Sequence, residues 1–181
     1  ILASANQALS ALERYKARLD QTSAGLDSLE IEDLVTVRDV TSVLQLMEMV
    51  RRISDDIDSY VLELGTDGRL LALQVEELTR GLLAEHGFLL EDYLPEGLDT
   101  ATVDARLKWV GSPALLDLAM VARSMGLGGI DGQDLDAQVS PRGLRILSKI
   151  PRLPVVTARA VVEQWGSLQG VLGATIEELE A

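Results

Sequence analysis

Five basic side chains lie close together near the C-terminal end of the sequence: Arg142, Arg145, Lys149, Arg152 and Arg159. No acidic residue interrupts residues 137–162, although the whole chain has 29 acidic and 16 basic residues and a formal net charge of −13. Because Lys and Arg hold phosphate groups, this distribution predicts a phosphate-binding end on an otherwise acidic chain. Such contacts would position a polyanion without reading its sequence.

The spacing around these basic residues is typical of a helix-hairpin-helix, in which two short helices meet at a turn. Apolar or small residues fill the packing positions, and proline stands where this motif often has one: Leu147, Ile150, Pro151, Leu153, Ala158 and Val161. In such hairpins the turn's backbone N–H groups and the positive end of the second helix face a phosphate. Arg152 and Pro154 stand where glycine is usual. Pro154 has no N–H to donate, so we expect the Arg152 side chain to replace part of the lost contact.

Other candidate sites carry weaker signals. The stretch GLGGIDG, residues 126–132, has the glycine content of a phosphate-cradling loop. It follows a helical pattern and lacks the Gly-Lys-Ser/Thr ending, which favours a connection between domains. The stretch DGQDLD, residues 131–136, lacks the glutamate of a calcium-binding loop. His86 is the only histidine and there is no cysteine, so we expect neither a metal site nor catalytic residues.

Helices must position these residues, because apolar side chains recur at steps of three and four and strand patterns are nearly absent. We expect an amphipathic helix from Leu2, helices over 32–64 and 69–84, a loop-rich connection over 85–102, and a helix over 141–150 with Ser140 as its N-cap. In the last helix the basic residues fall on one face, and Leu144, Leu147 and Ile150 fall on the other. The predicted fold class is all-α.

We divide the chain into a helical bundle over 1–127, a Gly- and Asp-rich connection over 128–138, and a hairpin domain over 139–181. No apolar run is long enough to cross a bilayer, so we expect a soluble protein without a membrane partner. The absence of cysteine fits a cytoplasmic protein. The first residue is Ile1 rather than Met, which suggests a piece of a longer chain.

Four segments together resemble the DisA family of DNA-integrity-scanning diadenylate cyclases, in an actinobacterial form. They are ASANQALSALERYKARLD (3–20), LEIEDLVTVRDV (29–40), MVRRISDDIDSYVLELGTDGRLLALQ (49–74) and VSPRGLRILSKIPRLP (139–154). The resemblance runs from Ala3 to the end of the chain. The resemblance also accounts for the missing glycines, because the first hairpin turn of this family has the sequence KIPRLP.

The resemblance implies a parent with an N-terminal cyclase domain, an elongated helical linker domain and a C-terminal tandem helix-hairpin-helix domain, RuvA domain 2-like. Such a parent condenses two ATP into cyclic di-AMP with Mg or Mn, forms a homo-octamer through its cyclase domains, and binds branched, Holliday junction-like DNA, which suppresses synthesis in DNA-damage checkpoint signalling. Its location is cytoplasmic and nucleoid-associated. The family's Asp-Gly-Ala and Arg-His-Arg motifs have no counterpart here, and the second hairpin is missing. We therefore expect an inert fragment without a cofactor.

A different class of function remains open. The chain could instead be a helical scaffold or oligomerisation module whose basic end binds a protein partner rather than DNA. Charge stripes are often only solvated helix faces. Salt-dependent binding to a DNA junction would separate the two interpretations, because phosphate contacts weaken steeply with salt.

Overall fold

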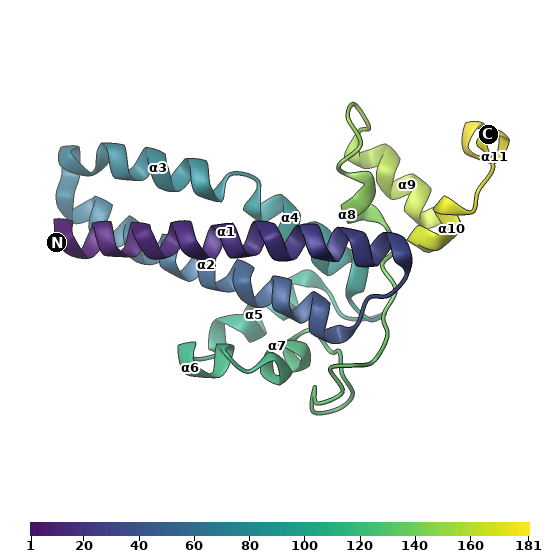
Figure 1. Ribbon diagram of the computed structural model, residues 1–181, viewed down its shortest axis with the longest axis horizontal. Helices are drawn as coiled ribbons and strands as arrows, with labels where there is room; N and C mark the ends of the chain where they lie inside the picture. Colours follow the sequence, from purple (N-terminus) through teal and green to yellow (C-terminus); the bar gives the residue numbers. More distant parts are fainter.

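The computed structural model describes residues 1–181, and its regular elements are all helices (Figure 1). In chain order they are α1 (Leu2–Glu32), α2 (Val37–Leu64), the 3-10 helix η1 (Gly65–Gly68), α3 (Arg69–Thr79), α4 (Leu82–Tyr93), α5 (Thr100–Trp109), α6 (Ser112–Leu115), α7 (Leu118–Ser124), α8 (Leu144–Leu147), α9 (Val155–Trp165), α10 (Leu168–Leu172) and α11 (Ile176–Glu180). One isolated bridge joins Thr36 to Gln138, and there is no sheet. The predicted all-α class is confirmed. None of the helices combines the length and apolar content of a membrane span.

The long antiparallel helices α1 and α2 form the central pair of the fold (Figure 1). Four α1 residues, Ala5, Leu12, Leu19 and Leu26, are buried. They lie seven residues apart, which is two helical turns, so they form one stripe that packs against α2. This stripe belongs to a cluster of 27 buried apolar residues to which α2, α4, α5 and α7 contribute.

The boundary between α1 and α2 differs from the prediction. The helix expected over 32–64 begins only at Val37. Asp33 adopts a left-handed conformation that ends α1. Thr36 and Asp39 then form a capping box that starts α2, so two local signals separate the helices.

The prediction for residues 69–102 was wrong in two places. The expected single helix over 69–84 breaks near Gly81, which has a φ of 79°. The expected loop over 85–102 is largely helical, because α4 continues through Gly87 to Tyr93 and α5 begins at Thr100. Leu89 and Leu90 are fully buried, and packing of these side chains outweighs the weak helix propensity of glycine.

The C-terminal part has its own small hydrophobic cluster of five buried residues, Leu144, Leu147, Ala158, Val162 and Val171. Phe88 of α4 packs partly against it. Residues of the preceding loop, Leu135, Ala137 and Val139, pack instead against the large cluster. The division at 128–138 stays a prediction.

Candidate nucleic-acid interface

The predicted hairpin is present as α8 and α9, joined by a turn that contains Pro151 and Pro154. Leu147 and Ala158 are buried between the helices, and Leu153 and Val161 pack against them, as their spacing predicts. Pro154 is the N-cap of α9, and both prolines are exposed. Ile150 departs from the prediction: its side chain is 47% exposed and does not join the cluster, because α8 has already ended at Leu147.

The start of α8 is capped by a residue that is distant in sequence. The carboxylate of Asp92 on α4 accepts hydrogen bonds from the backbone N–H groups of Gly143, Leu144 and Arg145, with N···O distances of 3.1, 2.8 and 3.0 Å. The Ser140 N-cap and the helix over 141–150 were therefore wrong predictions. Burial raises the pKa of Asp92 to about 6, while the three N–H donors oppose that rise.

Arg145 is the centre of a buried ion-pair cluster, with only 1% of its side chain exposed. Its guanidinium lies 2.7 Å from Asp27 Oδ1, pairs with Glu30, and donates to the Ser23 carbonyl at 3.1 Å. All three acceptors lie on α1. Arg145 does not lie on the solvated basic face predicted for it, because its side chain points into the protein; its phosphate contact stays a prediction.

Glu30 is the most perturbed carboxyl group of this cluster. It is fully buried, and its Oε2 atom has no hydrogen-bond partner. Burial raises its pKa to about 7, even though the charge of Arg145 lowers it, and the nearby carboxylates Asp92 and Asp27 add to the rise. The cost of burying the charged form of Glu30 therefore exceeds the attraction of Arg145.

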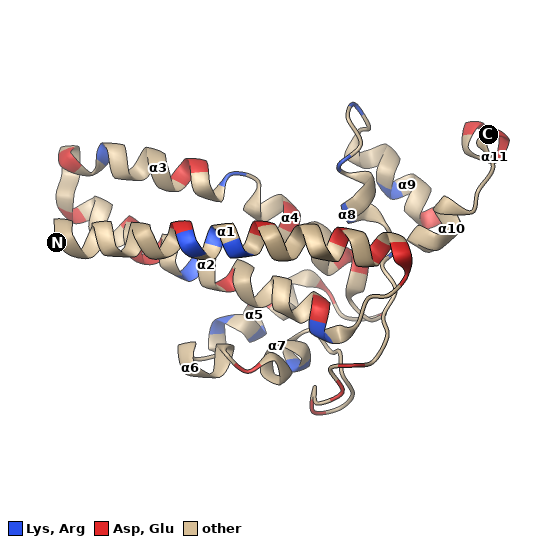
Figure 2. Ribbon diagram, in the orientation of Figure 1, with Lys and Arg blue, Asp and Glu red and all other residues tan.

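Three further basic residues of the predicted set are held by groups of the chain itself. Arg142 donates to the carbonyls of Glu91 and Leu94 at 2.6 and 2.9 Å. Lys149 pairs with Asp27. Arg159 makes two hydrogen bonds to the Glu91 carboxylate, at 3.2 and 2.9 Å, which raises the pKa of its guanidinium. Figure 2 shows acidic residues gathered at the C-terminal end of α1, beside the hairpin. The phosphate roles of these three residues stay predictions.

Arg152 is the one member of the set without a partner in the chain. It is exposed in the turn and has a φ of 66°, the left-handed conformation that glycine adopts most easily. The backbone N–H groups of the first α9 residues, Val155, Val156 and Thr157, donate to no group of the chain. The tip of the hairpin therefore presents one unpaired cation beside unpaired N–H donors.

Sequence reasoning missed the acidic residues that hold the hairpin in place: Asp27, Glu30, Glu91 and Asp92. One signal was available for Glu30. Glu30 lies about one helical turn after Leu26, on the same buried face as Leu12 and Leu19. A charged residue on this face requires a buried partner. The sequence alone offered no means of choosing Arg145 as that partner.

The fold and this site together define an all-α protein in which a long helical bundle carries a small helical hairpin. Residues 1–133 match the family model described as the DisA bacterial checkpoint controller linker region. The chain therefore belongs to the DisA family.

Several relatives carry the name DNA integrity scanning protein DisA. The chain is 52% identical to that of Parafrankia sp. (strain EAN1pec), over 100% of this chain and 51% of the relative. It is 51% identical to that of Streptomyces coelicolor, over 99% and 49%, and 48% identical to that of Kineococcus radiotolerans, over 99% and 50%. The chain thus spans about half the length of these relatives.

Proposed function

We propose that this chain is the linker and DNA-contacting portion of a DisA protein, and that the tip of the α8–α9 hairpin binds the phosphate backbone of branched double-stranded DNA. The observation that carries the proposal is the unpaired Arg152 beside the free N–H groups at the start of α9. A helix N-terminus attracts anions, and a nearby guanidinium adds a charged hydrogen-bond donor. The relatives' name, DNA integrity scanning protein, supports the same assignment.

The parent protein would synthesise cyclic di-AMP from two ATP and assemble as an octamer, and DNA bound at the hairpin would suppress synthesis. The family's Asp-Gly-Ala and Arg-His-Arg motifs of the cyclase have no counterpart in this sequence. Asp67 and Gly68 lie in η1 between two helices, and no three His, Cys, Asp or Glu side chains are grouped to hold a metal ion. We therefore assign the cyclase reaction to a part of the parent outside residues 1–181 and derive no catalytic step here.

The test measures binding to a four-way DNA junction and to a matched linear duplex. Fluorescence anisotropy detects the binding over a range of salt concentrations. Arg152→Glu should weaken junction binding by roughly tenfold at low salt and reduce the slope of log affinity against log salt by about 1. Arg152→Gly should retain more binding than Arg152→Glu, because glycine keeps the turn conformation and adds no repulsion.

Arg69→Glu is the matched control. Arg69 is exposed and forms no ion pair, and it begins α3 at the opposite end of the bundle (Figure 1). It undergoes the same change of charge and should leave binding almost unchanged. Equal losses in both variants would show only a general charge effect. Absence of salt-dependent binding by the unmodified chain would favour the helical scaffold instead.

A further inference from the structure

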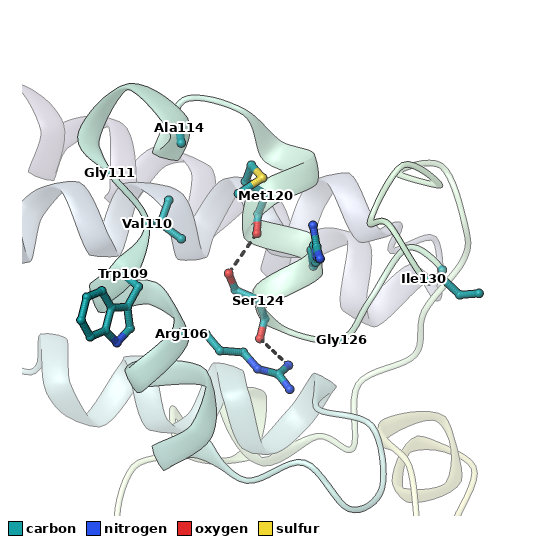
Figure 3. Close-up of a pocket in the computed structure, with 11 residues that line it drawn as sticks. Arg106, Trp109, Val110, Gly111, Ala114, Met120, Ser124, Gly126 and Ile130 are labelled. Carbon is teal, nitrogen blue, oxygen red and sulfur yellow. Dashed lines mark hydrogen bonds between the residues drawn. The ribbon is translucent and has the colours of Figure 1, made fainter.

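A cleft lies on the side of the bundle formed by α5, α6 and α7, closed at one end by the glycine-rich loop after α7 (Figure 3). Its volume is about 830 Å³, within the range of roughly 300–1,000 Å³ that small-ligand sites occupy. Its lining includes Arg106, Trp109, Met120, Arg123, Gly129 and Ile130. The hairpin contributes no residue to this lining, so the DNA contact proposed for the hairpin does not account for the cleft.

The lining contains two arginines and no acidic residue. Neither Arg106 nor Arg123 forms an ion pair, although the chain has 29 acidic residues and its other arginines pair in many places. The one hydrogen bond of the Arg106 side chain is a long one, 3.4 Å to the Ser124 carbonyl. A cleft lined by one sign of charge concentrates ions of the opposite sign, so this cleft favours an anion.

The glycine-rich loop adds backbone donors and a fixed shape. Gly132 has a φ of 74° and packs so closely on α7 that a Cβ atom there would lie 2.3 Å from the Ala119 carbonyl oxygen. The backbone N–H groups of Gly128, Gly129 and Ile130 donate to no group of the chain. Successive free N–H groups in a turn form an anion-binding concavity. The loop is therefore held against α7, and its residues Gly129 and Ile130 line the same cleft as the two arginines.

The two ends of the cleft are apolar and exposed. Trp109 has 91% of its surface exposed, in a chain with only two tryptophans. Ile130 at the other end is fully exposed. Figure 3 shows Arg106 lying between them and reaching toward Gly126. An exposed indole provides a flat face for stacking, and nucleic-acid bases stack on such faces.

We propose that this cleft binds a nucleotide, with Arg106, Arg123 and the free N–H groups of the loop on the phosphate and Trp109 on the base. The ligand is either a free nucleotide or an unpaired nucleotide of a single strand, since both present a phosphate next to a flat ring. No residue of the hairpin lines this cleft, and the class of ligand is inferred from the lining residues alone.

The experiment measures Trp109 fluorescence in a Trp165→Phe background, where Trp109 is the only tryptophan. The probes are AMP, adenosine, inorganic phosphate, thymidine monophosphate and a short oligothymidylate, with calorimetry as a second readout. AMP should change the fluorescence at lower concentration than adenosine or phosphate, because only AMP supplies both groups. Tighter binding of the oligothymidylate than of thymidine monophosphate would identify a single strand as the source, and equal binding a free nucleotide.

Arg106→Gln with Arg123→Gln should weaken AMP binding at least about tenfold, the loss expected when charged donors to a phosphate are removed. Lys108→Gln is the matched control, since Lys108 is exposed on the same helix but does not line the cleft. Thermal unfolding of each variant verifies that it is folded, and Arg152→Glu should leave the Trp109 signal intact. No signal from AMP or oligothymidylate at millimolar concentration, or equal AMP binding by the double variant, would overturn the proposal.

Discussion

Raising the pH from 6 to 8 should lower the free energy of unfolding of the chain, and Glu30→Gln should remove most of that effect. Burial raises the pKa of Glu30 from 4.5 to about 7 in the folded protein. In the unfolded chain this carboxyl regains its ordinary pKa, so the folded state binds the proton more tightly. The stability contributed by Glu30 is therefore fully present below pH 4.5 and falls as the pH rises through 7.

The expected loss follows from the two pKa values. Integrating the difference in proton binding between folded and unfolded states gives about 1 kcal/mol between pH 6 and pH 8. Asp92, with a pKa raised to about 6, adds a smaller loss of the same sign. His86 acts in the opposite direction, because burial lowers its pKa and the unfolded chain binds a proton more readily near pH 6. The informative quantity is thus the difference between the unmodified chain and Glu30→Gln, in which the other groups cancel.

The assay is thermal unfolding at pH 6 and pH 8. On raising the pH, the unmodified chain should lose about 2–4 °C in melting temperature relative to Glu30→Gln, the shift expected for about 1 kcal/mol in a chain of this size. Glu32→Gln, an exposed neighbour on α1, should behave like the unmodified chain. If Glu30→Gln and the unmodified chain respond equally to pH, Glu30 does not take up a proton in this interval and the reasoning is refuted.

Two other substitutions test the loop and the hairpin. Gly132→Ala should lower the free energy of unfolding in urea by at least about 2 kcal/mol more than Gly129→Ala, because both have a positive φ but only Gly132 abuts the α7 backbone; equal losses would contradict the close packing. If the hairpin binds DNA, Glu91→Gln should release Arg159 and tighten junction binding by about twofold to fivefold, as expected for an exposed ion pair. Glu85→Gln, an exposed acid on the same helix, should have no such effect on anisotropy titrations, and a matching gain there would indicate general charge repulsion.

The long helices were predictable because their information is local. The buried apolar residues of α1 recur every seven positions. The capping box that starts α2 is formed by Thr36 and Asp39, which lie within four residues of sequence. The capping box of Thr175 and Glu178 that starts α11 is local in the same way. The spacing also identified the hairpin turn and its buried pair Leu147 and Ala158. Periodicity was sufficient to find these helices, but the local signals at Asp33 and Thr36 that separate α1 from α2 were overlooked.

The failures at α8 lie where a distant residue decides the conformation. Ser140 and Pro141 resemble a helix start, but Asp92, some 50 positions earlier, provides the cap, and α8 begins at Leu144. The amphipathic assignment of Arg145 failed for the same reason. A helix of one turn has no independent faces, and acidic groups on α1 determine which of its side chains point inward.

If Lys149 binds phosphate as the sequence predicts, docking of the hairpin and phosphate binding compete for this side chain. Asp27 is shared between Lys149 and the buried Arg145. If a phosphate binds Lys149, Asp27 keeps Arg145 as its only cationic partner. The ion pair of Asp27 with Arg145 then becomes stronger, and that of Glu30 with Arg145 becomes weaker. Glu30, whose pKa is already about 7, would then hold its proton more firmly. If the hairpin binds phosphate through Lys149, this binding and protonation of Glu30 are linked, and each favours the other by the same free energy.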